Sequence, residues 1–211
     1  MSVYHHTHLE QDLFLLPEKA IYWSQQKMMI ISDPHFGKIQ HFRKAGLAVP
    51  KAASYKNWQQ LFRLLTRPEL EQVLFLGDLF HSDWNKEWKD FAFLLSQFPE
   101  LRYHLVLGNH DSLDENWYSD SRINIHKELL LSPYHFTHEP ENTNEYNICG
   151  HIHPAVRLRG SGRQGLRLPC FYFGNQQAIL PAFGIFTGTH KIKSSKEDDI
   201  FVIAENQVIK L

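Results

Sequence analysis

Four short apolar runs in this chain each end in a cluster of glycine, aspartate, asparagine or histidine. Continuous apolar runs of four or five residues are typical of strands that are buried on both faces, as in a parallel sheet. The carboxyl ends of such strands meet along one edge of an open sheet, where ligands bind. The repeated pattern therefore predicts one shared site built from four strand ends. The runs are residues 28–31, 73–76, 103–107 and 146–149, and the polar clusters that follow them are residues 32–35, 77–81, 108–111 and 150–154.

The composition bounds the class of protein. With 211 residues, 43% of them hydrophobic, the chain suits one domain that spans residues 1–211. Its formal net charge of −1 gives no global field that favours nucleic acid, although a local basic patch is compatible with it. Because we find no signal peptide in the first 17 residues and no apolar run near the ~20 residues of a membrane span, we expect a cytoplasmic protein with no membrane partner. Cys149 and Cys170 lie in apolar contexts and are predicted to be reduced core thiols.

The periodicity divides the chain into two halves. Up to residue 107, it predicts a hairpin, then strands that alternate with amphipathic helices, and hence a mainly parallel sheet. Beyond residue 120 it predicts short strands without long helices, which indicates a second, more antiparallel sheet packed on the first. The charged stretch 191–199 and the polar leader with its three histidines, His5, His6 and His8, are expected at the surface. The expected elements are strands 13–16, 20–23, 28–31, 73–76, 102–107, 122–126, 133–137, 146–149, 155–159, 166–173, 178–180, 200–204 and 207–210, and helices 52–66 and 84–98.

The polar clusters have the chemistry of a hydrolytic metal site, which uses carboxylates and neutral imidazoles, with a carboxylate able to bridge two ions. Asp33 and His35 are alternate residues, as are His151 and His153, so each pair can lie on one face of an extended segment. A lone histidine after a strand is more often a surface or hydrogen-bonded residue, but four such endings together favour a metal site. The candidate ligands are Asp33, His35, Asp78, Asn109, His138, His151 and His153.

These motifs, in this order from residue 33 to residue 153, resemble the motif series of the calcineurin-like metallophosphoesterases. The resemblance implies a four-layer α/β/β/α sandwich of two mixed sheets flanked by helices. It also implies two divalent ions, which bridge a hydroxide that attacks phosphorus in line. Carried over motif by motif, one ion would be held by Asp33, His35, Asp78 and His153, and the other by Asp78, Asn109, His138 and His151.

The resemblance leaves three polar residues outside the ligand set. His110 is the candidate for stabilising the phosphoryl oxygens or protonating the leaving group, and Asp111 is the candidate for orienting it. His81 fits a role on the substrate side or behind a ligand.

A narrower resemblance is carried by residues 33–46 and by the tail, residues 153–188, which is similar to that of the bacterial DNA-ligase-associated metallophosphoesterases. This similarity implies a manganese-dependent phosphodiesterase or DNA endonuclease in DNA repair, encoded beside a DNA ligase and a helicase. Iron, zinc and cobalt are alternative metals, since mixed oxygen and nitrogen ligation suits them all. Homodimers are common in the family, but no sequence stripe here demonstrates one. The sequence departs from the pattern at Thr189-His190, where a further glycine is expected.

Support for DNA from the residues themselves is a basic stretch just after His153. It carries four arginines and no acid between residues 157 and 167, and it is either a phosphate-binding loop or a solvated basic hairpin. Two further cations follow the first motif. The candidate substrate-binding residues are Lys38, Arg43, Arg157, Arg159 and Arg163.

Two other functions use the same residues. The site could act on a small nucleotide-type substrate, as a phosphoesterase or pyrophosphatase, or the chain could be a non-catalytic metal-binding scaffold. The scaffold is disfavoured because all seven ligands and His110 are present.

Overall fold

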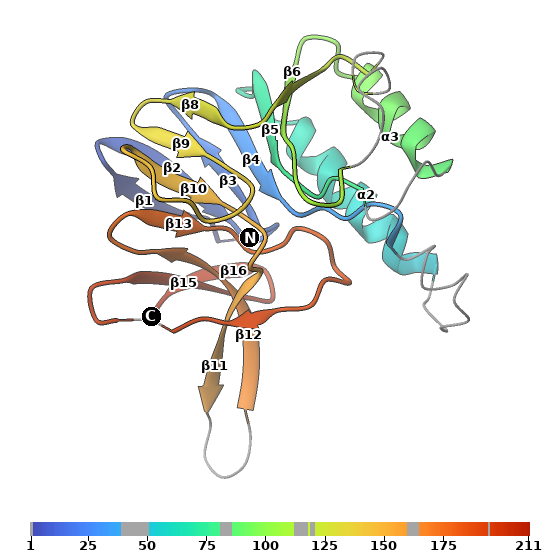
Figure 1. Ribbon diagram of the computed structural model, residues 1–211. Helices are drawn as coiled ribbons and strands as arrows, with labels where there is room; N and C mark the ends of the chain where they lie inside the picture. Colours follow the sequence, from blue (N-terminus) through green and yellow to red (C-terminus); the bar gives the residue numbers. More distant parts are fainter. Residues whose placement is uncertain are drawn as a thin grey trace.

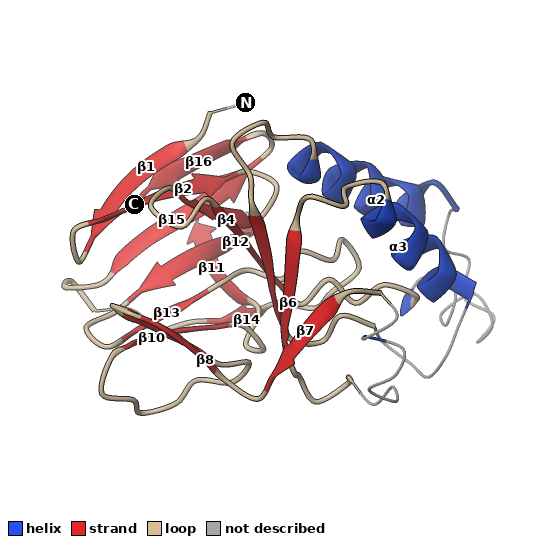
Figure 2. Ribbon diagram, turned by 90° about the horizontal axis from the view of Figure 1, so that it is seen from above, coloured by secondary structure: helices blue, strands red, loops and turns tan. Residues whose placement is uncertain are grey.

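Two β-sheets pack face to face, and helices cover the outer face of the first sheet (Figures 1 and 2). This computed structural model describes residues 2–38, 51–80, 86–111, 118, 121–159, 165–193 and 195–211. Within those residues, no helix is both long and apolar enough to span a membrane.

The first sheet is built from the N-terminal half of the chain in simple sequential order, β1-β2-β3-β4-β5-β6-β7. Neighbouring strands from β1 to β4 are antiparallel, and those from β4 to β7 are parallel. The parallel part therefore places the carboxyl ends of β4, β5 and β6 side by side. The strands are β1 (Tyr4–His8), β2 (Gln11–Leu16), β3 (Ala20–Trp23), β4 (Met28–Ser32), β5 (Gln72–Leu76), β6 (Arg102–Val106) and β7 (Ile123–His126).

Both predicted helices are present, as α2 (Lys51–Leu65) and α3 (Lys86–Ser96). Each places an apolar face on the first sheet, α2 with Leu61 and Leu65 and α3 with Phe91 and Leu95. The described part of the second helix is Lys86–Ser96, and Trp84, where the sequence predicts its start, lies outside the described residues.

The second sheet is mixed and uses the C-terminal half, in the order β14-β11-β12-β13-β10-β9-β8, with β15 paired to β12 and to β16. Within it, strand β10 is parallel to both β9 and β13. The strands are β8 (Leu129–Leu131), β9 (Tyr134–Phe136), β10 (Tyr146–Cys149), β11 (Pro154–Arg159), β12 (Gly165–Phe173), β13 (Gln177–Ile179), β14 (His190–Lys191), β15 (Asp199–Ala204) and β16 (Gln207–Lys210).

The period of two along β4 explains why its run is continuously apolar. Met29 and Ile31 point into the cluster shared with the helices, whereas Met28 and Ile30 point into the cluster between the sheets. A strand that is covered on both faces exposes no side chain to solvent, so its positions are apolar. The cores on the two sides hold the end of β4 in place.

The predicted α/β class with two packed mixed sheets is confirmed. In the described part of the chain the helices cover only the first sheet, and the outer face of the second carries a small apolar cluster around Cys170, Ile200 and Val202. Cys149 and Cys170 are free and buried, as predicted.

The surface assignment of the N-terminal leader was wrong for two of its histidines. Residues 4–8 form β1, and its inward positions put His6 and His8 against Phe173, Tyr134 and other aromatic rings of the second sheet. His5, on the opposite face, is exposed. The predicted surface loop 191–199 is also shorter than expected, because its ends belong to β14 and β15.

Candidate metal centre

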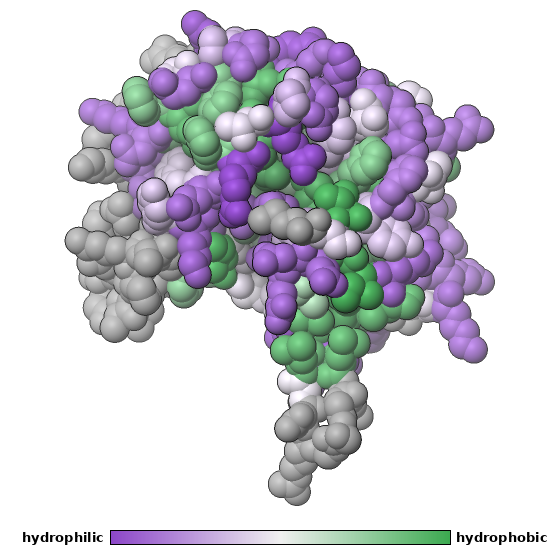
Figure 3. All heavy atoms as spheres, turned by 180° about the vertical axis from the view of Figure 1, so that it is seen from behind, coloured by the Kyte–Doolittle hydropathy of each residue, from purple (hydrophilic) through white to green (hydrophobic). Residues whose placement is uncertain are grey.

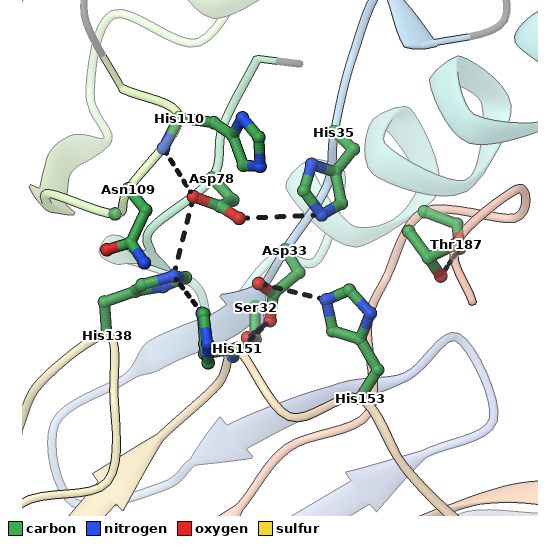
Figure 4. Close-up of polar contacts among 12 residues, drawn as sticks. Ser32, Asp33, His35, Asp78, Asn109, His110, His138, His151, His153 and Thr187 are labelled. Carbon is green, nitrogen blue, oxygen red and sulfur yellow. Dashed lines mark hydrogen bonds and ion pairs between the residues drawn. The ribbon is translucent and has the colours of Figure 1, made fainter. Parts of the chain in front are cut away.

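Two groups of metal-ligating side chains face each other where strands of the two sheets end (Figure 4). The first group lies after β4 and β10, and the second after β5, β9 and β10. In each group one ligand atom from every residue lies within 4.8 Å of the others. The groups are Asp33, His35 and His153, and Asp78, His138 and His151.

Asp78 joins the two groups through its two carboxylate oxygens. Its Oδ2 lies 3.7 Å from His35 Nε2, and its Oδ1 lies 3.5 Å from His138 Nε2. Each oxygen therefore faces a different group, which is the arrangement that a bridging carboxylate requires. The carboxylate is buried, so little water competes for it.

The backbone at these ligands is unusual. Asp33, His35, Asp78, His151 and His153 all have positive φ, between 46° and 62°. Only a few per cent of non-glycine residues adopt this region, at a cost on the order of 1–3 kcal/mol each. Such strain persists where the surrounding fold imposes it, and it clusters at functional sites. Here it turns each side chain away from its strand direction and toward the neighbouring ligands.

Two glycines of the motifs lie so close to neighbouring residues that a side chain would not fit. Gly77 has φ +70°, and a Cβ on it would collide with the His138 imidazole and would lie 2.8 Å from the Gly108 Cα. A Cβ on Gly150 would collide with Ser32 Oγ and would lie 2.5 Å from Asp33 Oδ2. Glycine at these positions lets the segments before Asp78 and His151 approach their partners.

Backbone carbonyls select the ring nitrogens that face the centre. His138 Nδ1 donates to the Leu76 carbonyl at 3.1 Å, and His153 Nδ1 donates to the Gly188 carbonyl at 3.2 Å. Both rings therefore leave Nε2 as the lone-pair nitrogen, directed at a carboxylate. Through the Gly188 carbonyl, the segment after β13 therefore orients the His153 ring.

Asp33 is fully buried, yet one of its oxygens has no hydrogen bond. Its Oδ2 accepts from the Ser32 hydroxyl and from the His151 backbone N–H at 3.0 Å. Its Oδ1 lies 3.3 Å from His153 Nε2, and neither atom has a hydrogen-bond partner among the described residues. A buried carboxylate oxygen and imidazole nitrogen without such bonds fit a divalent cation.

Asn109 lies at the exposed rim of the second group. Its Nδ2 donates to Glu139 Oε1 at 2.6 Å, and that same oxygen is 4.0 Å from His151 Nε2. The sequence reasoning missed Glu139, whose only signal was its position directly after His138. It also missed Ser32, whose hydroxyl orients Asp33.

His110 and Asp111 occupy different positions relative to the centre. The His110 backbone N–H donates to Asp78 Oδ1 at 3.0 Å, and its exposed ring lies 5.7 Å from the His35 ring. Asp111 accepts from the backbone N–H groups of Leu79 and Gly108, at 2.8 and 2.9 Å. Asp111 therefore ties the loop after β5 to the loop after β6. Burial raises the pKa of Asp111 to about 6, and the Asp78 carboxylate adds to the shift.

The candidate substrate-binding residues are only partly brought together. Lys38 is half-buried and lines a recess with His35. Burial lowers the pKa of its amine, while the carboxylates of Asp78 and Asp33 act in the opposite direction. His81, Arg43 and Arg163 lie outside the described residues, as does the side chain of Arg159.

Arg157 stands on the β11–β12 hairpin, which projects from the body of the molecule (Figure 1). It lines a separate hollow, with Lys191 and Lys196. Leu158 and Leu166 pair across the same hairpin and are 37% and 59% exposed. Figure 3 shows apolar atoms gathered where this hairpin leaves an otherwise largely hydrophilic face. A role of the hairpin in substrate binding stays a prediction.

A family model and the structure of a nuclease both agree with this fold. The family model for calcineurin-like phosphoesterases matches residues 27–203. The crystal structure of Pseudomonas putida nuclease MPE is similar to this chain with a TM-score of 0.82 and 28% sequence identity, over 100% of both chains. The structure of a protein of unknown function from Aquifex aeolicus, AQ665, has a TM-score of 0.44 and 20% identity, over 60% of this chain and 78% of that chain. A search of curated proteins found no match.

Proposed function

This chain belongs to the calcineurin-like phosphoesterase family, and on that premise we propose that it is a phosphodiesterase that cleaves nucleic acid. It is a metal-dependent phosphoesterase, hence a hydrolase. What is proposed beyond the family is the use of two ions together, the preference for diesters and the nucleic-acid substrate.

The observation that carries the use of two ions is the position of Asp78. One carboxylate presents one oxygen to His35 and the other to His138, each of which belongs to a separate ligand group. A structural site for a single ion would not need a second group of ligands on the far side of the same carboxylate. The seven residues proposed as ligands are Asp33, His35, Asp78, Asn109, His138, His151 and His153.

Divalent ions in such a centre would activate a water molecule and neutralise charge on the phosphate. The residues of the chain bind the ions, orient the rings and donate the proton. Asp33 and Asp78 would provide the negative charge that holds the ions, and the carbonyls behind His138 and His153 keep Nε2 of each ring free to bind metal. His110 lies exposed beside His35, where it can donate a proton to the oxygen that leaves phosphorus. Lys38 lines a recess with His35 and can neutralise a substrate oxygen there.

A polymeric substrate is supported by the exposed rim of the centre among the described residues. Asn109 and His110 are exposed. The recess beside His35 has a volume of only about 10 Å³, which cannot enclose a nucleotide. A strand that lies across the surface can still bring one phosphate to the ligands. The similarity to a nuclease over the full chain supports the same class of substrate. DNA as that substrate, manganese as the native metal, and a repair role beside a ligase and a helicase are parts of this proposal.

The first test compares a diester with a monoester. Metal-stripped protein is assayed on bis-p-nitrophenyl phosphate and on p-nitrophenyl phosphate, with Mn²⁺, Zn²⁺, Co²⁺, Fe²⁺ or no metal added back. We expect the diester to be preferred and Mn²⁺ to give the highest rate. A labelled DNA oligonucleotide should then be cut under the same conditions. Monoester preference, or diester cleavage without any cutting of DNA, would instead favour a small nucleotide-type substrate.

A further inference from the structure

A turn after β13 carries two exposed apolar side chains next to the metal centre. Ile185 and Phe186 are each 37% exposed, whereas Phe183, three residues earlier than Phe186, is fully buried in the core. Neither exposed residue is a buried member of the apolar clusters formed by the described residues. An exposed apolar pair at the rim of a polar site is a candidate contact surface for a ligand.

The turn is held firmly to the strand end that carries Asp33. The backbone N–H of Phe183 donates to the Ser32 carbonyl at 2.8 Å, and that of Gly184 donates to the Asp33 carbonyl at 3.2 Å. The N–H of Ile185 donates to Asn57 Oδ1 of α2 at 3.2 Å. The exposed pair therefore has a defined position relative to the ligands.

The far end of the same turn is also tied to the centre. Thr187 Oγ1 donates to the Gly184 carbonyl at 2.8 Å, which closes the turn, and the Gly188 carbonyl accepts from His153 Nδ1. Figure 4 shows Thr187 on the loop that passes beside His35 and His153. Residues 183–188 thus contact both Asp33 and His153.

Phe186 shares a recess with the metal ligand His35 and with Lys38. That recess, of about 10 Å³, is too small to hold a planar ring inside it. A ring could lie only on top, against the exposed face of Phe186. Beside it, the Lys38 amine offers a positive charge for a phosphate. An aromatic face next to a cation is the combination by which proteins bind nucleic-acid strands, because bases stack and phosphates pair with the charge.

We propose that Phe186 is a stacking platform for the nucleobase adjacent to the scissile phosphate, an inference that rests on the proposed function. The base would be recognised through its π-face and not through its hydrogen-bonding edges, so the platform should tolerate all four bases. Phe186 would act in positioning: by holding the neighbouring base, it fixes which phosphate of the strand reaches the ligands.

The test is a double-mutant cycle between the side chain and the base. Oligonucleotides with one defined cleavage position are prepared intact, or with an abasic site immediately on either side of that position. The wild type, Phe186→Ala, Phe186→Leu and Phe186→Tyr are compared by kcat/KM on each oligonucleotide with Mn²⁺. Phe93→Ala removes a more exposed phenylalanine, on α3, and serves as the matched control.

We expect the wild type to lose about 5- to 150-fold in kcat/KM when one of the two flanking bases is removed, which is the range for stacking on an aromatic side chain. Phe186→Ala and Phe186→Leu should lose a similar factor on the intact strand and little more on the abasic one. Phe186→Tyr should retain the wild-type pattern, and so should Phe93→Ala. Phe186→Leu removes the aromatic ring but keeps most of the apolar volume, so it tests stacking even if Phe186→Ala folds poorly.

Two results would overturn the platform. One is that removal of either flanking base lowers kcat/KM by the same factor in the wild type and in Phe186→Leu. The other is that Phe186→Leu loses activity equally on intact and abasic strands, which would assign the turn a structural or protein-docking role. Hydrolysis of bis-p-nitrophenyl phosphate by the wild type separates these failures from failure of the proposed function. A wild type that hydrolyses this diester but cuts no oligonucleotide would disprove the nucleic-acid substrate, and the platform with it.

Discussion

Two groups of histidines in this molecule have very different surroundings. The histidines of the metal centre face carboxylates, and His138 and His153 have one ring nitrogen fixed by a backbone carbonyl. The inward histidines of β1, His6 and His8, lie between the sheets against aromatic rings.

The electrostatics of the two groups differ accordingly. Burial lowers the pKa of His8 to about 4, with a further decrease from His6 and an opposing increase from Asp199. Burial also lowers the pKa of His6, and Asp199 again acts in the opposite direction. In contrast, the centre surrounds its histidines with buried carboxylates and positive-φ backbone. The comparison teaches that the proposed ligands His138 and His153 differ from the histidines of β1 by a backbone carbonyl behind the ring and a carboxylate in front of it.

The largest expected effect comes from the carboxylate that the two ligand groups share. We expect Asp78→Asn to reduce diester hydrolysis by about 10³-fold or more, because bound ions supply several kcal/mol and each 1.4 kcal/mol is a factor of ten. Metal content measured by mass spectrometry should fall at both groups. Asp90→Asn, an exposed aspartate on α3, should be indistinguishable from the wild type. Near-normal activity in Asp78→Asn would mean that the bridge is wrongly assigned.

The next effect separates a histidine that acts on substrate from the histidines that hold metal. We expect His110→Ala to keep its full metal content and to slow turnover by about 10²–10⁴-fold, the usual range for loss of a general acid. The alkaline side of the pH–rate profile should flatten, since the proton donor is gone. The exposed His190 supplies a control, His190→Ala. Loss of metal from His110→Ala would place that histidine among the ligands instead.

A smaller effect tests the close packing behind the ligands. Gly150→Ala forces a Cβ against Ser32 and Asp33, so we expect the free energy of unfolding to fall by about 1–3 kcal/mol. Metal affinity should weaken by about 10–100-fold, as for loss of a residue that orients a ligand. A Cβ on Gly188 meets nothing within 4 Å, and Gly188→Ala should change stability by less than about 0.5 kcal/mol. Equal effects of the two substitutions, measured by urea unfolding and metal titration, would contradict this account of the packing.

The smallest effect concerns the histidines of β1. The pKa of His8 is about 4 in the folded protein and 6.5 in the unfolded chain, so the unfolded state binds more protons between these values. The stability contribution of neutral His8 is therefore complete above pH 6.5 and is lost progressively as the pH falls toward 4. We expect His8→Gln to reduce the loss of metal-free stability between pH 7 and pH 5, as measured by urea midpoints. His190→Gln, at an exposed histidine of β14, serves as the control.

Most of the centre could be predicted from the sequence because its ligands follow their strands directly. The apolar runs before Asp33, Asp78 and His151 identify strands, and parallel strands bring their carboxyl ends to one edge. Local spacing and residue type were therefore sufficient to select residues that the structure places in two ligand groups. The helices and the division into two sheets followed from periodicity in the same way.

Other features depended on contacts between residues far apart in the chain. The sequence of β1 is polar, and only its pairing with β2 and its packing on the second sheet partly bury His6 and His8. Glu139 reaches Asn109 from thirty positions away, and the Gly188 carbonyl reaches His153 from thirty-five. The position of Phe186 beside His35 likewise depends on hydrogen bonds from its turn to β4 and α2. Residue type and local spacing determined which side chains could bind metal, whereas the register of two packed sheets decided what stands behind and beside them, because those partners meet only after distant strands have paired.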